Sequence, residues 1–168
     1  MAVVNTKSTI ITNADATPVV LTSPRIAGGF LAAEVATVEV AAADDDGSTF
    51  RLFRLPSNAK VVSIRLLNDA ITGGTSYDVG IYRTAKDGGA VVDADAFASA
   101  VDMSSARTTA FFEAAYESTN ADIANIEREL WQVAGATSDP SVSYDIVLTA
   151  NTVGTAAGTI SAIIEYIA

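Results

Sequence analysis

Residues 66–83 read LLNDAITGGTSYDVGIYR: a strand, a loop with two adjacent glycines, and a second strand. Asn, Asp and Gly favour turns, so the stretch predicts a β-hairpin whose glycines permit the turn. None of its residues is typical of catalysis. The most distinctive segment of the chain therefore predicts framework and contact surface.

Segments that alternate apolar and polar residues, as half-buried strands do, surround this stretch. In SVSYDIVLT (141–149), one side of the predicted strand is apolar and the other is polar: Val142, Tyr144, Ile146 and Leu148 oppose Ser141, Ser143 and Asp145. In TISAIIEYI (159–167), Ile163 and Ile167 fall among the polar positions, so this strand is a candidate for cover on both faces. Further strands are predicted at 34–42, 49–55, 60–67, 76–83 and 108–116, with a short one at 19–22. About eight strands with turn residues between them predict a mainly β fold, an antiparallel jelly-roll-like β-sandwich.

The first thirty residues are rich in Thr, Ser, Ala and Val, contain Pro18 and Pro24, and end in a Gly28-Gly29 pair. This composition predicts an extended N-terminal arm and not a helix. The whole chain has 168 residues, which is long enough for one domain with a full hydrophobic core and too short for two ordinary domains. We therefore expect an arm at 1–30 and a single β-sandwich domain at 31–168.

Two segments break the strand pattern. NADIANIERELWQVAG (120–135) has Asn120 as a possible cap, an apolar stripe and a terminating Gly135, and predicts one short helix against the sheet. Segment 92–104 could form a turn or two of helix with Phe97 and Val101 on one face.

The composition excludes several classes of function. The chain has no cysteine and no histidine, which removes disulfides, thiolate metal sites and the usual nucleophile and base pairs. Its formal charge of −10 would repel nucleic acid at long range. No apolar run is long enough to span a membrane, and the N-terminus does not resemble a secretory signal. We expect neither nucleic acid nor a membrane as partner.

The candidate motifs for chemistry have simpler explanations. The acidic run DDDG (44–47) lacks the spaced oxygen ligands of a calcium loop and fits a hairpin turn. Asp93 and Asp95 form a pair of the kind used in acid–base catalysis, but they precede the predicted helical turns, where carboxylates favour the helix dipole. The spaced glycines match no phosphate-binding motif. We predict no catalytic, cofactor-binding or metal-binding residue, and no enzyme.

The middle of the chain is basic in an otherwise acidic sequence. Residues 51–86 contain only two acidic residues, Asp69 and Asp78, and six basic ones: Arg51, Arg54, Lys60, Arg65, Arg83 and Lys86. Either each arginine pairs across strands with a carboxylate, or the arginines form a docking face for an acidic protein surface. Neighbours on a strand alternate in direction, so Arg51 and Arg54 can share a face only across a bulge or at a strand end.

Several phrases together carry a resemblance to a known group. RLLNDAITGGTSYDVGIYR (65–83), MAVVNTKSTIITN (1–13), AFASAVDMSSA (96–106), ERELWQ (127–132) and NTVGTAAGTISAIIEYIA (151–168) resemble small virion structural proteins of tailed bacteriophages, described as head cement, decoration or minor capsid proteins. The likeness runs over nearly the whole chain and rests on strand and loop residues. It implies a jelly-roll-like domain, self-association, often as a homotrimer, and attachment to the outer face of a shell built by a major capsid protein.

The expected function is therefore that of a virion structural protein. It would bind the capsid exterior after assembly in the host cytoplasm and stabilise the shell, with Arg51, Arg54, Arg65 and Arg83 as candidate capsid contacts. The alternative is a head-fibre or tail-associated carbohydrate-binding module, since sandwiches commonly host lectin-like sites. Against it, aromatic residues make up only 7% of the chain, and Trp131 lies on the predicted helix. A third hypothesis is a hydrolase built on the acidic pair Asp93 and Asp95.

Overall fold

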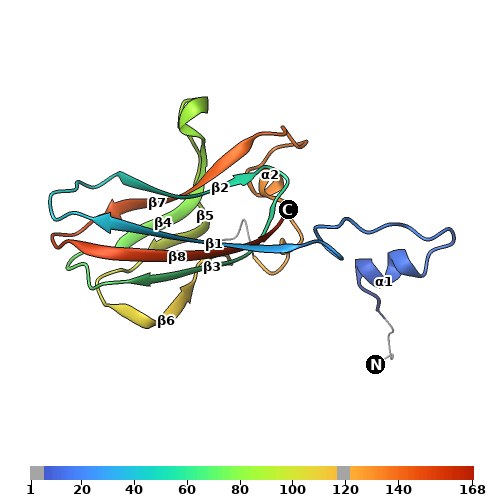
Figure 1. Ribbon diagram of the computed structural model, residues 1–168, viewed down its shortest axis with the longest axis horizontal. Coiled ribbons are helices and arrows are strands. Elements are labelled where there is room, and N and C mark those ends of the chain that lie inside the picture. Colours follow the sequence, from blue (N-terminus) through green and yellow to red (C-terminus); the bar gives the residue numbers. More distant parts are fainter. Residues whose placement is uncertain (1–5, 117–121) are drawn as a thin grey trace, which may run out of the picture.

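The computed structural model describes residues 6–116 and 122–168, and within them eight strands form two antiparallel four-stranded sheets that pack face to face (Figure 1). The strands are β1 (Leu31–Val40), β2 (Ser48–Pro56), β3 (Lys60–Asn68), β4 (Ser76–Arg83), β5 (Val91–Val101), β6 (Arg107–Glu113), β7 (Ser143–Thr152) and β8 (Gly158–Ile167). The predicted mainly β sandwich is confirmed.

The order of the strands is that of a jelly roll. One sheet has the order β1-β8-β3-β6 and the other β2-β7-β4-β5. Early strands pair with late ones throughout, β1 with β8, β2 with β7, β3 with β6 and β4 with β5. The chain therefore behaves as one long hairpin rolled over itself, which is how a jelly roll is built.

The stretch at 66–83 is not a hairpin, because β3 and β4 belong to different sheets. The loop between them crosses one end of the sandwich with Ile71 fully buried under it. Its backbone bonds to the β5–β6 loop, where Ile71 N–H donates to the Met103 carbonyl and Met103 N–H donates to the Gly74 carbonyl. Because Ile71 is buried in the core and these hydrogen bonds hold the loop to the β5–β6 loop, the chain crosses to the other sheet and does not turn back to pair with β3. The acidic run between β1 and β2 likewise joins the two sheets.

The core lies between the sheets and follows the alternation of the strands. Tyr144, Ile146 and Leu148 of β7 are buried in the same core cluster as Ile160, Ala162 and Ile164 of β8. Tyr77 is fully buried, and its hydroxyl donates to the Val153 carbonyl at 2.7 Å. Burial raises the pKa of Tyr77 to about 12. The buried hydroxyl of Tyr77 is therefore hydrogen-bonded.

Strand β5 corrects the helical turns predicted at 92–104. Phe97 and Val101 are buried as expected, but on a strand. Val79 of β4 pairs with Ala98 of β5, and Ile81 pairs with Asp93. Strand β5 therefore has extra residues between these two pairs and bulges there. The bulge lies directly on Gly80, where an added Cβ would come within 2.2 Å of the carbonyl oxygens of Asp93 and Ala94. A strand interrupted by a bulge loses its period of two, which explains the wrong prediction.

The helix predicted at 120–135 is reduced to α2 (Leu130–Val133). Residues 122–128 form turns in which the Asp122 side chain accepts from the Ala124 and Asn125 amides. The Leu130 amide donates to the Ala59 carbonyl and the Trp131 amide to the Ser57 carbonyl, both at 2.8 Å. These amides bond to the β2–β3 loop and not to a preceding helical turn, so the helix starts only at Leu130. The predicted cap, Asn120, lies outside the described residues.

The N-terminal segment projects beyond the end of the sandwich, next to the start of β1 (Figure 1). It contains a helix that the sequence did not predict, α1 (Thr9–Ala14), capped by the Ser8 side chain. The predicted short strand at 19–22 is absent; the Val20 amide instead donates to the Asn13 carbonyl at 3.1 Å. The arm is therefore folded locally on itself. The division of the chain at residue 30 stays a prediction.

Candidate interaction surfaces

The structure distributes the four candidate arginines over both sheets. Arg51 and Arg54 lie side by side on the outer face of β2, whereas Arg65 lies on β3 in the other sheet. Arg83 ends β4 and stacks on the inward-facing Tyr144, 5.5 Å from the ring centre. Arg51 also donates to the main-chain carbonyl of Arg83 at 2.9 Å, so the fold brings Arg51, Arg54 and Arg83 together and leaves Arg65 apart.

A bulge in β2 joins Arg51 and Arg54 on one face. The register of the pairing with β7 shifts between Arg51 and Phe53. This is the bulge that the sequence required for Arg51 and Arg54 to share a face. Both guanidinium groups bind Asp145, Arg51 at 2.7 Å and Arg54 at 2.6 Å. Asp145 is only 2% exposed. Burial alone would raise its pKa, but hydrogen bonds from Arg54 and Arg51 outweigh burial and lower the pKa below the usual value.

The remaining arginines also have partners within the chain. Arg65 forms an ion pair with Glu165 at 2.5 Å and lies 5.3 Å from the ring centre of Phe111. The cross-strand ion pairs that the sequence offered as an explanation therefore exist for Arg51, Arg54 and Arg65. Their side chains stay 32%, 49% and 33% exposed, so this pairing leaves part of each guanidinium accessible to a partner.

The acidic motifs serve the backbone. Asp44 accepts from the Ala41 amide at 2.8 Å, and Asp46 accepts from the Val153 amide at 2.9 Å. Asp93 and Asp95 lie on β5 and precede no helix, so the helix-dipole explanation for this pair is wrong. In residues 6–116 and 122–168 no group of three or more carboxylates is placed to hold a metal ion.

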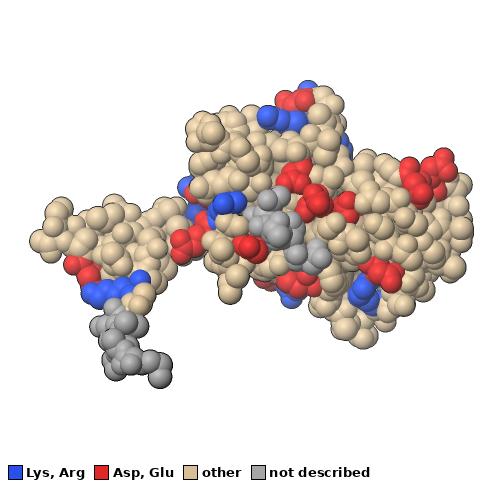
Figure 2. All heavy atoms as spheres, turned by 180° about the vertical axis from the view of Figure 1, so that it is seen from behind, with Lys and Arg blue, Asp and Glu red and all other residues tan. Residues whose placement is uncertain are grey.

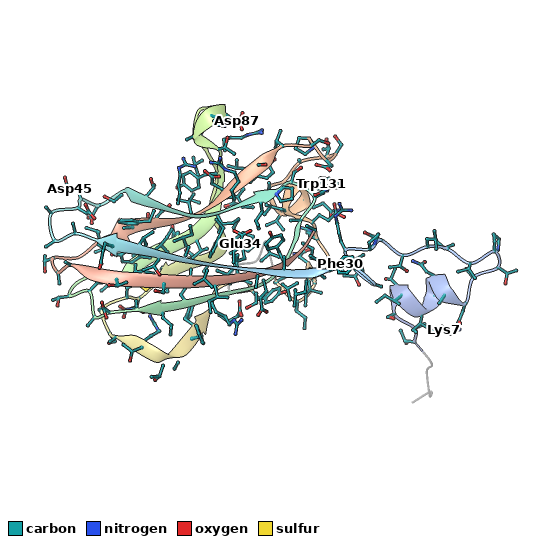
Figure 3. The ribbon with its side chains drawn as sticks, viewed as in Figure 1. Lys7, Phe30, Glu34, Asp45, Asp87 and Trp131 are labelled. Atoms are coloured by element: carbon teal, nitrogen blue, oxygen red, sulfur yellow. The ribbon has the colours of Figure 1, made fainter. Side chains whose placement is uncertain are left out.

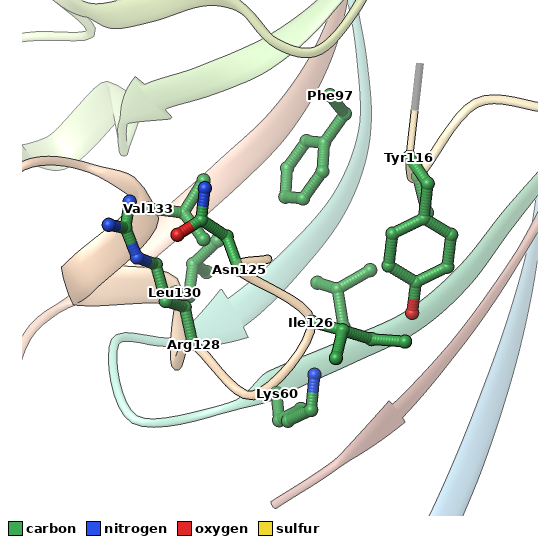
Figure 4. A pocket seen from close by; sticks show the side chains of 10 residues that line it. Lys60, Phe97, Tyr116, Asn125, Ile126, Arg128, Leu130 and Val133 are labelled. Carbon is green, nitrogen blue, oxygen red and sulfur yellow. The ribbon is translucent and has the colours of Figure 1, made fainter. Parts of the chain in front are cut away.

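A small cavity lies between α2 and β3 (Figure 4). It measures about 10 Å³, room for about one water molecule. Phe97, Tyr116 and Ile126 point into it, and the buried Lys60 side chain lies at its edge. Burial lowers the pKa of Lys60. A cavity of this size fits a structural water and not a substrate.

Trp131 does not form an open platform for a sugar ring. It is half-buried, and its indole N–H donates to Glu129 at 2.8 Å. The hollow beside it, about 250 Å³, is lined by Ile26, Ala124, Asn125, Glu127, Arg128, Glu129 and Gln132. These residues include no aromatic ring, which lectin-like sites use to stack on sugars.

Apart from Ile123, which is 90% exposed, the most exposed large apolar side chains of the described chain lie on the arm and on β1, where the sequence predicted no contact residue. On the arm, Val19, Val20 and Leu21 are 64%, 51% and 92% exposed. Phe30, at the junction of arm and sandwich, is 89% exposed (Figure 3). The signal in the sequence was the apolar cluster at 19–21, within the short strand predicted at 19–22.

A second apolar surface lies on the outer face of the sheet that contains β1. Leu31 faces Ile167 across the β1–β8 pair, and Val35 faces Ile163. Leu31 is 61% and Val35 72% exposed. We call these four residues the outer patch. The sequence suggested that β8 is covered on both faces. In the structure, Ile163 and Ile167 on the outer face of β8 are only partly covered within the described chain.

Charge is distributed unevenly between these surfaces and the rest of the molecule. On the face shown in Figure 2, carboxylates occur at several places over the sandwich, while most of the projecting arm carries no charge. Residues 16–24 contain no charged side chain. None of the helices in the described part of the chain is long and apolar enough to cross a membrane.

No protein-family model matches the chain, and no curated protein matches it significantly. Among solved structures it is similar to a chain of the capsid of Ralstonia phage GP4, with a TM-score of 0.56 and 18% identity over 83% of this chain and 84% of that one. It is also similar to a chain of the cyanophage Pam1 capsid asymmetric unit, with a TM-score of 0.51 and 16% identity over 91% of this chain and 96% of that one. At these identities the likeness shows the fold alone. The two structures that share this jelly roll are chains of phage capsids, so their fold agrees with the one that the resemblance in the sequence implies.

Proposed function

We propose that the chain is a structural protein of a phage virion that binds the outer face of the capsid shell and stabilises it. The observation that carries this proposal is the shared fold. The jelly roll matches chains of two phage capsids over most of this chain and most of theirs. The partner would be the major capsid protein, and the role would be structural and not catalytic.

The surfaces of the molecule support a role in assembly. The outer patch and the arm expose apolar side chains that a protein acting alone would gain by burying. A shell offers many equivalent binding places, so contacts that are individually weak add up when several copies act together.

The first test of the proposal is to locate the chain in the particle. Mass spectrometry of purified virions should find it at about one copy for every few capsid subunits, and a reconstruction should place its sandwich outside the shell. A virion enzyme would need far fewer copies. Absence of the chain from virions, or density inside the shell, would overturn the proposal.

The candidate contacts are tested separately. Arg51, Arg54, Arg65 and Arg83 remain our candidates for an electrostatic contribution to docking. We expect the double change Arg65→Gln and Arg83→Gln to lower occupancy on purified shells at 0.1 M salt, where the Debye length is about 10 Å. Occupancy of the unchanged protein should fall at 1 M salt, where that length is about 3 Å.

Lys86→Gln is the control, because Lys86 is exposed and its replacement removes one positive charge from the same basic segment. Equal occupancy for the arginine and control variants, with binding as strong at 1 M salt, would exclude an electrostatic face. Shell binding would then rest on apolar contacts, and the proposed function would stand.

A further inference from the structure

We infer that the arm of one copy binds the outer patch of a second copy of this chain. The inference concerns the isolated protein and holds whether or not a shell is bound. It rests on the two apolar surfaces described above, the arm segment Val19–Leu21 and the outer patch of Leu31, Val35, Ile163 and Ile167. Each is exposed or only partly covered within its own chain.

The two surfaces are kept apart within one chain by the way the arm is anchored. Residues 23–27 form a turn in which the Ile26 and Ala27 amides both donate to the Ser23 carbonyl. Arg25 lies 3.9 Å from Glu129 of the sandwich, and an added Cβ at Gly29 would collide with Ile167 and the Pro24 carbonyl. This close packing directs the arm outward, past the end of the strands (Figure 1). The base of the arm therefore contacts Ile167 of its own patch, while Val19–Leu21 are directed away from the sandwich, toward a neighbour.

The end of the arm is also a preformed unit. The Asn13 side chain donates to Thr22 at 3.1 Å, the Asn13 carbonyl accepts from Val20, and Lys7 pairs with Asp15 at 2.7 Å. These bonds connect α1 to the segment 20–22 and leave Leu21 pointing into solvent at 92% exposure. A segment that is already ordered loses less conformational entropy when it binds.

Charge favours a second copy at this place. Two chains with a formal charge of −10 repel each other, so they approach most easily where both surfaces are uncharged. Residues 16–24 of the arm carry no charge. Glu165 lies between Ile163 and Ile167 on the same face, and its charge is neutralised there by the ion pair with Arg65.

The outer face divides at the middle of β1. At the end near the arm it presents the patch, whereas at the far end Thr37 bonds to Ser161 and Thr159 bonds to Glu39. Along the β1–β8 pair, the apolar surface therefore lies at the end near the arm. The arm of each copy can bind the patch of another either reciprocally in a dimer or head-to-tail in a closed ring.

The absence of cysteine from the chain permits a direct test. Full-length Leu21→Cys and Val35→Cys chains, distinguished by a mass tag, are co-expressed and oxidised. We expect a disulfide between the two chains. The matched control pairs Leu21→Cys with Val91→Cys, since Val91 is another exposed strand valine, 56% exposed, but on the opposite sheet. No cross-link to position 35, or an equal yield with position 91, overturns the inference.

Native mass spectrometry of the isolated protein gives a second measurement. We expect an oligomer at micromolar concentration, and Val35→Asp should raise its dissociation constant about tenfold or more, because it places a charge in a buried apolar contact. Val91→Asp should leave the oligomer unchanged. A monomeric wild-type protein, or equal effects of the two changes, contradicts the arm–patch contact and leaves shell binding to be judged on virions.

Discussion

Asp145 is the residue on which the basic part of the molecule depends. It is nearly inaccessible, yet it stays charged because Arg51 and Arg54 both donate to it. A buried carboxylate without such partners would be strongly destabilising. The arginines that the sequence marked as a surface feature therefore also hold the β2–β7 pair together, and replacing them affects the fold as well as any contact.

We predict that Asp145→Asn lowers the free energy of unfolding at pH 7 by about 1.5–3 kcal/mol, the range for hydrogen bonds to charged groups. Both arginines are partly exposed, so water will replace part of what they lose. Urea unfolding measures the difference. Asp45→Asn, which removes the same charge from an exposed loop position, should change stability by much less. Equal losses in the two variants would show that net charge, and not the buried pair, is responsible.

At the scale of the strands, position in the chain was easier to predict than pairing. The segments 49–55, 60–67 and 76–83 nearly coincide with β2, β3 and β4, because burial on one face imposes a period of two. That period is the same whether the next strand pairs in the same sheet or crosses to the other. The crossing at 66–83 depends on Ile71 and on bonds to the distant Met103, which no local pattern contains.

Gly80 tests the most crowded contact between strands. A methyl group at this position would meet two backbone carbonyls of β5, which cannot move as a flexible side chain can. We expect Gly80→Ala to lower the free energy of unfolding by several kcal/mol or to prevent folding. Gly47→Ala is the comparison: its site is open but has a φ of 89°, so it should cost only about 1–2 kcal/mol. Thermal unfolding followed by circular dichroism measures both, and similar losses would mean that β5 yields at the bulge.

At the scale of the whole molecule, the absence of histidine and cysteine predicts stability that is nearly independent of pH around neutrality. Hydrogen bonds lower the folded-state pKa of Asp145 and of Asp139, so their contribution is present above about pH 4 and is lost as pH falls. Burial raises the pKa of Tyr77 to about 12, and that of Tyr116. Their contribution is present below about pH 10 and is lost as pH rises further.

Lys60 acts in the opposite sense at the alkaline end. Burial lowers its pKa, so the unfolded state binds more protons and stability rises as pH approaches about 10.4. Scanning calorimetry between pH 3 and 11 should therefore show a plateau near neutrality, a fall below about pH 4 and a fall above about pH 10. A sharp change in melting temperature between pH 6 and 7 would contradict this profile.

The candidate surfaces were only partly predictable. Charge is visible in a sequence, so the arginines were found, but their partners were not, because Asp145 and Glu165 are far from them along the chain. The outer patch had one local sign, the apolar Ile163 and Ile167 at polar positions. Its other half, Leu31 and Val35, joins it only through the β1–β8 register. A surface formed by the first and last strands cannot be recognised from either alone.

The pairing of early with late strands also has a consequence for synthesis. In one sheet β8 lies between β1 and β3, and in the other β7 lies between β2 and β4. Until residues 143–167 have left the ribosome, each sheet lacks one of its two inner strands, and the inward faces of β1 to β4 have no complete core to enter. We expect the nascent polypeptide to fold only after its last strands emerge, with the slow kinetics of distant pairings and with exposed apolar strands for chaperones to protect in the meantime.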